Sequence, residues 1–156
     1  MCRRQGINIY PFLRILTGLL FMTSGFEKVI SPHQNFLYVI QSYAFLNPLL
    51  EEMAAHLLPW CEFFIGIFLV LGLWLNRSLL GLAFLLVMFL EAVAQAILRH
   101  LPIEECGCFG GLMSFPLPSV LVFDTALFIL TGLMYYKIEK TQRFSLDQYL
   151  FKNEAP

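Results

Sequence analysis

Charged side chains are scarce in this sequence. Only 13% of its 156 residues are Asp, Glu, Lys or Arg, about half of the share that typical soluble domains carry. Hydrophobic residues make up 58%. This imbalance excludes an ordinary soluble domain and indicates a protein of the lipid bilayer. The net charge of −1 leaves no excess of cations, so we expect no nucleic-acid partner.

The first hydrophobic run lacks a cleavage site of the small-x-small type. It extends from Ile7 to Phe26 behind a short basic N-terminus, and its one charged residue is Arg14. Because the run is longer than the core of a cleaved signal peptide, we interpret it as an uncleaved anchor and as the first span. On a helix Arg14 shares a face with Gly25 and Lys28, so it either meets a neighbouring helix or extends to the membrane surface.

Three further hydrophobic runs follow, at residues 57–75, 78–98 and 117–136. Only Asn76 and Arg77 separate the first two of these runs, which predicts a tight helical hairpin. Four spans of about twenty residues predict an all-α polytopic membrane protein, built as a four-transmembrane-helix bundle.

The connection at residues 31–58 is the longest one with polar residues. Ser-Pro and Asn-Pro pairs flank a segment in it that has one apolar face and no Lys or Arg. Interfacial anchors usually carry such cations, so we predict a short extra helix in the first outer loop that rests on the bundle as a lid. We assign residues 1–138 to one membrane domain and residues 139–156 to a polar cytoplasmic tail.

Lys and Arg are distributed unevenly over the connections. The two outer connections hold only Lys28 and Arg99. The N-terminus, the second connection and the tail hold the others, which are Arg3, Arg4, Arg77, Lys137, Lys140, Arg143 and Lys152. The positive-inside rule therefore predicts a bacterial inner-membrane protein with both termini in the cytoplasm and the connection after residue 98 on the periplasmic side.

Cysteine is rare, yet Cys106 and Cys108 stand one residue apart in that periplasmic connection. A disulfide between them would be strained, because a relaxed one needs Cα atoms about 4.4–6.8 Å apart. Gly107 between them permits the unusual backbone that the bond requires. Strained and exposed disulfides tend to be labile or catalytic, and the periplasm is oxidising. We therefore expect Cys106 and Cys108 to be the catalytic pair.

Ionisable residues also lie within the spans. Glu62, Glu91 and Asp124 each fall about 8–10 Å below the outer ends of their predicted helices. Carboxyl groups at such depth usually face the bundle interior or a wet cavity, as binding sites or proton paths, although a structural network is an open alternative. Lys28 and Arg99 are the cations on that side, and we expect Lys28 to pair with Glu62.

Other polar residues of the outer half follow helical spacing. Gln95 lies between Glu91 and Arg99, which draws a polar stripe toward the cysteines. Cys61 is expected to be a buried, inert thiol, with a resolving role in a thiol relay as the alternative. The histidines are expected to be ordinary surface side chains rather than metal ligands; they are His33, His56 and His100.

The sequence resembles the DoxX-like membrane proteins over residues 10–138. The segments that carry the similarity are Arg14-Ile15-Leu16-Thr17-Gly18, Ser24-Gly25-Phe26-Glu27-Lys28 and Pro59-Trp60-Cys61-Glu62. The run Cys106-Gly107-Cys108-Phe109-Gly110 resembles the pattern of one branch of that superfamily, the MauE branch. Its members are similar to the methylamine utilisation protein MauE. The family pattern often shows Arg before the Asp of the fourth helix, whereas Phe123 stands there in this chain.

This resemblance implies a function. MauE-like proteins are implicated in the maturation of exported, disulfide-containing proteins together with a periplasmic thioredoxin-like partner. The resemblance therefore implies a thiol–disulfide redox relay through Cys106 and Cys108. In this relay the chain is either a component of an oxidoreductase or a nonenzymatic member of the relay. The wider DoxX group includes quinone-linked sulfur-oxidation subunits, so a quinone cofactor is an open alternative.

The residues alone leave two other functions open. In one, the protein is a nonenzymatic membrane scaffold, and the Cys-x-Cys pair staples its outer loop. In the other, both thiolates and His100 bind a metal ion, but this set lacks the second pair of ligands that such sites usually have. Homo- and hetero-oligomers are both compatible with the sequence.

Overall fold

The computed structural model describes residues 9–43, 47–100, 116–142 and 145–147. Its helices are α1 (Ile9–Ile30), α2 (His33–Ser42), α3 (Pro48–Leu71), α4 (Leu75–Leu98), α5 (Leu117–Tyr136) and α6 (Ile138–Thr141). The described residues include no strand. Because α1, α3, α4 and α5 are long and apolar enough to cross a membrane, the predicted all-α, four-span membrane fold is confirmed.

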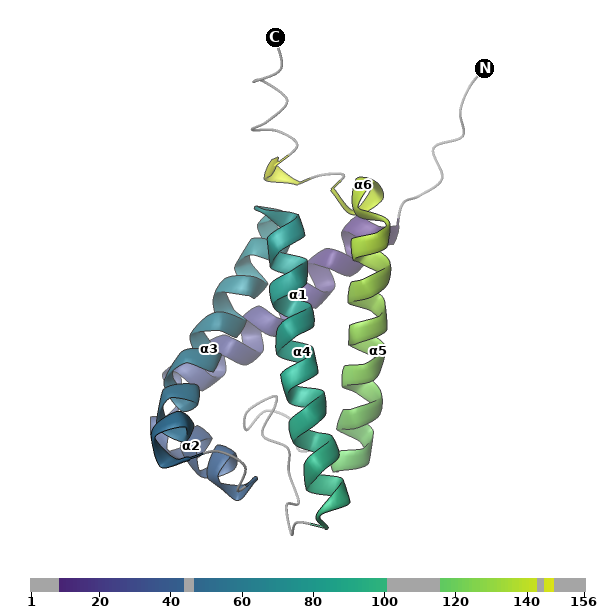
Figure 1. The fold of residues 1–156 in the computed structure, drawn as a ribbon. Coiled ribbons are helices and arrows are strands. Elements are labelled where there is room, and N and C mark those ends of the chain that lie inside the picture. The colour runs from purple at the N-terminus through teal and green to yellow at the C-terminus, as the bar shows by residue number, and fades with distance from the viewer. Residues whose placement is uncertain (1–8, 44–46, 101–115, 143–144, 148–156) are drawn as a thin grey trace, which may run out of the picture.

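The four long helices form one bundle, with the short helices at its two ends (Figure 1). In Figure 1, α1 runs obliquely behind α3 and α4, and α5 stands beside α4. The helix α2 lies at one end, and α6 lies at the other end, where α1 begins. The bundle therefore has an α2 end, at which α4 ends and α5 begins, and an α6 end, at which α3 turns into α4.

The turn between α3 and α4 differs from the predicted one. Asn76 and Arg77 were expected to form the turn, but both lie in the first turn of α4. The chain reverses instead at Gly72 and Trp74, whose φ angles are 69° and 44°. Glycine adopts such an angle at no cost, whereas tryptophan needs support from its surroundings. The carboxylate of Asp147 gives this support, because it accepts a hydrogen bond of 3.0 Å from the backbone nitrogen of Trp74.

Small residues bring α1 and α3 into backbone contact. A Cβ atom on Gly25 of α1 would lie 2.5 Å from the backbone nitrogen of Phe63, and one on Gly66 of α3 would overlap the backbone nitrogen of Met22. Only glycine fits at both positions. Close contact of this kind is how helices associate tightly in a bilayer, where no hydrophobic force draws them together.

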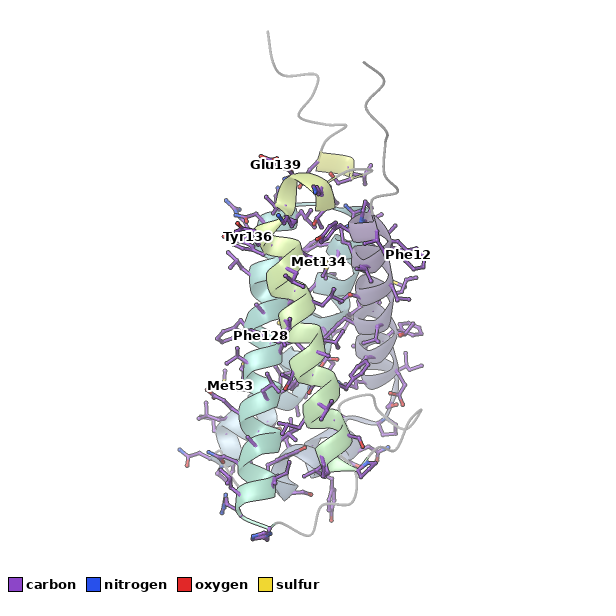
Figure 2. The ribbon with its side chains drawn as sticks, turned by 90° about the vertical axis from the view of Figure 1, so that its right-hand side faces the viewer. Phe12, Met53, Phe128, Met134, Tyr136 and Glu139 are labelled. Atoms are coloured by element: carbon purple, nitrogen blue, oxygen red, sulfur yellow. The ribbon has the colours of Figure 1, made fainter. Side chains whose placement is uncertain are left out.

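The interior of the bundle contains two apolar clusters. The larger one joins residues of α1, α3, α4 and α5: Phe21, Leu69, Leu75, Leu79, Leu82, Leu86, Leu127 and Met134. The smaller one joins α4 and α5 near the α2 end: Val93, Ala96, Leu117 and Val120. Phe12, Phe128 and Tyr136 are exposed on the outside of the bundle, as expected for helices that face lipid, whereas Met134 is fully buried (Figure 2).

The helix α2 lies on the bundle as the predicted lid. It packs against α3 and α1. Phe36 and Ile40 on one face are half-buried, and Gln34 and Gln41 on the other face are exposed. Its apolar face is therefore directed to protein.

The α6 end is closed by the segment that follows α5. Arg14 of α1 is fully buried, and its guanidinium donates a hydrogen bond of 3.0 Å to the carbonyl oxygen of Thr141. Ser145 packs at Gly72, and Asp147 accepts from the backbone nitrogens of the α3–α4 turn. We call Arg14, Thr141, Ser145 and Asp147 the tail clasp. Of the two interpretations of Arg14, contact with neighbouring segments is therefore correct, and the domain boundary at residue 138 stays a prediction.

We expect Gly66→Ala to destabilise the protein by about 1–3 kcal/mol, because the added methyl group forces the backbones of α1 and α3 apart. Gly132→Ala is the matched control, since a Cβ atom at Gly132 of α5 meets nothing within 4 Å. Thermal unfolding in one detergent compares the two variants. Equal melting temperatures would contradict the close crossing of α1 and α3.

A second expectation concerns the tail clasp. Asp147→Asn removes the charge that accepts two backbone N–H groups at the start of α4, and we expect a loss of about 1–2 kcal/mol. Glu139→Gln removes a carboxylate from an exposed position of α6 and should leave the unfolding temperature unchanged. Equal changes in the unfolding temperature for both substitutions would contradict the stabilising role of Asp147 in the tail clasp.

Candidate functional site

A buried ion pair joins α1 to α3. The Nζ atom of Lys28 lies 2.8 Å from both carboxylate oxygens of Glu62. Lys28 is 5% exposed and Glu62 is 0% exposed. Ser24, one turn before Lys28, donates a hydrogen bond of 3.2 Å from its hydroxyl to Glu62 Oε2. The expected contact between Lys28 and Glu62 is thereby confirmed.

The local sequence explains why these side chains meet. Ser24 and Lys28 are four residues apart and lie on one face of α1, with Gly25 beside them. Glu62 lies on the buried face of α3 at the point where Gly25 lets α3 approach. The glycine that brings the backbones together thus also brings the two charges together.

Two aromatic rings enclose the ammonium group of Lys28. Its Nζ atom lies 5.1 Å from the ring centroid of Phe36 on α2 and 5.5 Å from that of Phe89 on α4. Both distances fit a cation–π interaction, which gains strength where water is excluded. The lid helix and α4 therefore complete the site that α1 and α3 begin.

A second carboxyl group faces the same interior from α5. Asp124 is 3% exposed, and its Oδ2 atom has no hydrogen-bond partner among the residues that the structure describes. The charges of Lys28 and Glu62 both act on it, one by attraction and the other by repulsion. We call Lys28, Glu62 and Asp124 the buried charge cluster.

Tyr43, directly after α2, borders this cluster. Burial of its phenol, together with the negative charge that Asp124 carries whenever it is ionised, raises the pKa of Tyr43 to about 12, so its hydroxyl group is neutral at physiological pH. The carbonyl oxygen of Tyr43 accepts a hydrogen bond of 3.4 Å from Arg99 at the end of α4. Arg99 is exposed, and this contact links the ends of α2 and α4.

The polar stripe on α4, predicted to lead toward the cysteines, does not face the buried charge cluster, and its relation to the cysteines lies outside the described residues. Glu91 is exposed and Gln95 is half-buried, whereas Phe89 and Val93 take the inward positions of α4. Glu91 is two residues from each of these, which places it on another side of a helix with 3.6 residues per turn. The expectation that Glu91 shares the interior with Glu62 and Asp124 was therefore wrong.

The cysteines divide into two groups. Cys61 is exposed on α3, so the expectation of a buried thiol was wrong; its neighbour Glu62 takes the inward position instead. Cys106 and Cys108, the predicted catalytic pair, lie outside the described residues. Their roles remain predictions.

Two histidines meet near the lid, which the sequence did not indicate. The ring centroids of His33 on α2 and His56 on α3 are 4.0 Å apart. Within residues 9–43, 47–100, 116–142 and 145–147, no three His, Cys, Asp or Glu side chains lie close enough together to hold a metal ion. The pair of rings is thus a contact between the lid and α3.

Sequence reasoning missed three members of the site. Ser24 could have been found by its spacing, because it lies four residues before Lys28 and faces the same side of α1. Phe36 and Phe89 carry no such signal, since an aromatic residue on an apolar helix face usually belongs to the core. Only the packing of α2 and α4 brings their rings to the ammonium group.

Comparison with known proteins gives a single family. The profile of the family described as "Methylamine utilisation protein MauE" matches residues 7–137. The protein named "Methylamine utilization protein MauE" of Paracoccus denitrificans is 30% identical over 127 residues, which cover 78% of this chain and 68% of that protein. No solved structure matches. The matched region includes every member of the buried charge cluster.

The ion pair makes a quantitative expectation possible. Lys28→Met should destabilise the protein by about 3–5 kcal/mol, because it leaves Glu62 buried without its partner. Adding Glu62→Gln should recover part of this loss. Glu91→Gln on the exposed face of α4 is the matched control and should change little. Thermal unfolding in detergent measures the wild type, Lys28→Met, Glu62→Gln, the double variant and the Glu91→Gln control, and additive effects of the two single substitutions would count against the pair.

Proposed function

Because this chain belongs to the MauE family, we propose that it is the membrane component of a periplasmic thiol–disulfide relay that serves methylamine utilisation. In this relay Cys106 and Cys108 exchange disulfides with a thioredoxin-like protein during the maturation of exported proteins. The chain itself is a multi-pass membrane protein with four apolar helices.

The observation that carries the proposal is the Cys-Gly-Cys sequence in the connection between α4 and α5. These helices end and begin at the α2 end of the bundle (Figure 1). The lid and the buried ion pair of Lys28 and Glu62 belong to the same end. Two thiols one residue apart are suited to exchange, because the disulfide that they form is strained.

The distribution of cations supports a periplasmic position for the cysteine pair. Arg77, Lys137 and Lys140 lie at the α6 end. At the α2 end, Lys28 is neutralised within the bundle by Glu62, and Arg99, directly after α4, is exposed. The positive-inside rule therefore favours an inner-membrane orientation with the α6 end in the cytoplasm.

The exchange chemistry needs no further reactant. In the direction that oxidises the chain, the thiolate of one cysteine attacks the partner's disulfide, forms a mixed disulfide and releases a partner thiolate. The second cysteine then attacks this mixed disulfide and releases the other partner thiol. Two electrons and two protons pass from Cys106 and Cys108 to the partner, and a new disulfide closes in this chain.

The broader resemblance to DoxX-like proteins adds a second candidate, a quinone-linked oxidoreductase subunit. It is carried by residues 14–18, 24–28 and 59–62, and the structure shows that these segments supply the tail-clasp arginine and the ion pair of Lys28 and Glu62. In that case a quinol would supply the two electrons and two protons that reduce the new disulfide of this chain, or, in the reverse direction of exchange, a quinone would accept them from the two thiols. The third candidate, a nonenzymatic scaffold, requires no exchange at all.

The test is a trapping experiment in cells. Cys106→Ser or Cys108→Ser, whichever removes the resolving thiol, should leave the mixed disulfide unresolved and capture a thioredoxin-fold protein. Nonreducing gels followed by mass spectrometry identify the captured protein. We expect one of the two single variants, but not both, to accumulate the complex.

Cys61→Ser is the matched control, because it removes an exposed thiol of α3 from outside the pair. It should form no trapped complex and should retain growth on methylamine. Full growth of the variant in which both Cys106 and Cys108 are serine would eliminate the relay and favour the scaffold.

A further inference from the structure

The buried charge cluster contains more acid than base. Lys28 is its one cation, and it already holds both oxygens of Glu62 at 2.8 Å. Asp124 adds a second carboxyl group to the same interior. If both carboxyl groups were ionised, the cluster would carry one uncompensated negative charge.

An uncompensated charge is the costliest state for such a site. A carboxylate taken out of water needs either a cation or several hydrogen-bond donors. The Oδ2 atom of Asp124 has no donor among the described residues, whereas Glu62 receives both Lys28 and Ser24. The contacts thus favour a charge on Glu62 and a proton on Asp124.

The other groups around Asp124 leave this balance unchanged. At the end of α2, within reach of the charge of Asp124, lies Tyr43, whose phenol is neutral at physiological pH. On the side of α4, the ring of Phe89 lies against the ammonium group of Lys28, and Glu91 of that helix is exposed. Arg99 is also exposed and donates to the backbone of Tyr43.

We propose that Asp124 is a proton-binding site, held as a neutral acid by the ion pair of Lys28 and Glu62 and able to exchange its proton with water. The three side chains share one negative charge. While Glu62 carries this negative charge, Asp124 keeps its proton. When Glu62 becomes neutral, Asp124 ionises and becomes the counterion of Lys28.

This site goes beyond the proposed relay and does not depend on it. A carboxyl group that gains or loses a proton within the bundle can respond to a charge that appears nearby. Its use as the acceptor of a thiol proton during disulfide exchange would rest on the proposed function. The experiment below measures the proton on Asp124 directly, so its failure would leave the relay intact.

Infrared spectroscopy of the full chain in lipid vesicles at neutral pH tests the proposal. Asp124 and Asp147 are the aspartates of the chain, so carboxyl-labelled ¹³C-aspartate separates them from every glutamate. We expect an isotope-shifted C=O band of a protonated carboxylic acid. The band should be absent in Asp124→Asn, present in Asp147→Asn and shifted further in D₂O.

Two variants test the shared charge. In Glu62→Gln the band should disappear, because Asp124 is then the acid of the buried charge cluster that remains for Lys28. In Glu62→Gln combined with Lys28→Met the band should return, because the cation is gone. The wild-type spectrum needs no variant to fold, so the proposal stays testable even if a substitution prevents assembly.

Three results would overturn the proposal. Labelled wild-type protein that shows only carboxylate bands would mean that Asp124 is ionised. A band that does not respond to D₂O would mean that its proton cannot exchange. A band that persists unchanged in folded Glu62→Gln would mean that Asp124 does not share its charge with Glu62.

Discussion

The close crossing of α1 and α3 is the constraint on which the rest of the bundle depends. Gly25 and Gly66 bring the two backbones into contact, and Lys28 and Glu62 beside this contact are buried. An ion pair in such a place is stable only if its geometry is good and its remaining hydrogen-bonding capacity is used. Lys28 and Glu62 meet this condition through two contacts of 2.8 Å and the hydroxyl of Ser24. Backbone contact and charge pairing therefore stabilise each other.

The two ends of the bundle use polar groups differently. At the α6 end, Arg14 donates to the backbone carbonyl oxygen of Thr141, and Asp147 accepts from the backbone N–H groups at the start of α4. Such contacts fix the chain and leave little for chemistry. At the α2 end, the side chains of Lys28 and Ser24 bind the side chain of Glu62, and the Oδ2 atom of Asp124 has no hydrogen-bond donor among the described residues. That imbalance is what makes this end the candidate site.

The sequence predicted some residues of the site correctly and others wrongly, and individual residues show why. Glu62 and Lys28 were recognised because an ionisable residue within a span must find a partner, and few cations were available. Glu91 satisfied the same rule but is exposed, because α4 presents Phe89 and Val93 to the interior. Cys61 was expected to be buried, and its neighbour Glu62 is buried instead. Depth along a span can be counted from the sequence, whereas the direction of a side chain depends on the rotation of each helix.

The sequence by itself determined the class of this protein, the number of its spans and the presence of the lid. The length of a hydrophobic run and the spacing of its polar residues are local properties of the sequence. Each run is long and apolar enough by itself to cross the bilayer as a helix. Only the tertiary structure decided that Phe36 and Phe89 enclose Lys28, that Asp124 joins the ion pair, and that Asp147 closes the turn between α3 and α4. Each of these contacts joins residues far apart in the chain. Their positions depend on how the helices cross and rotate, and helices that are apolar on nearly every side carry no local pattern from which those angles could be read.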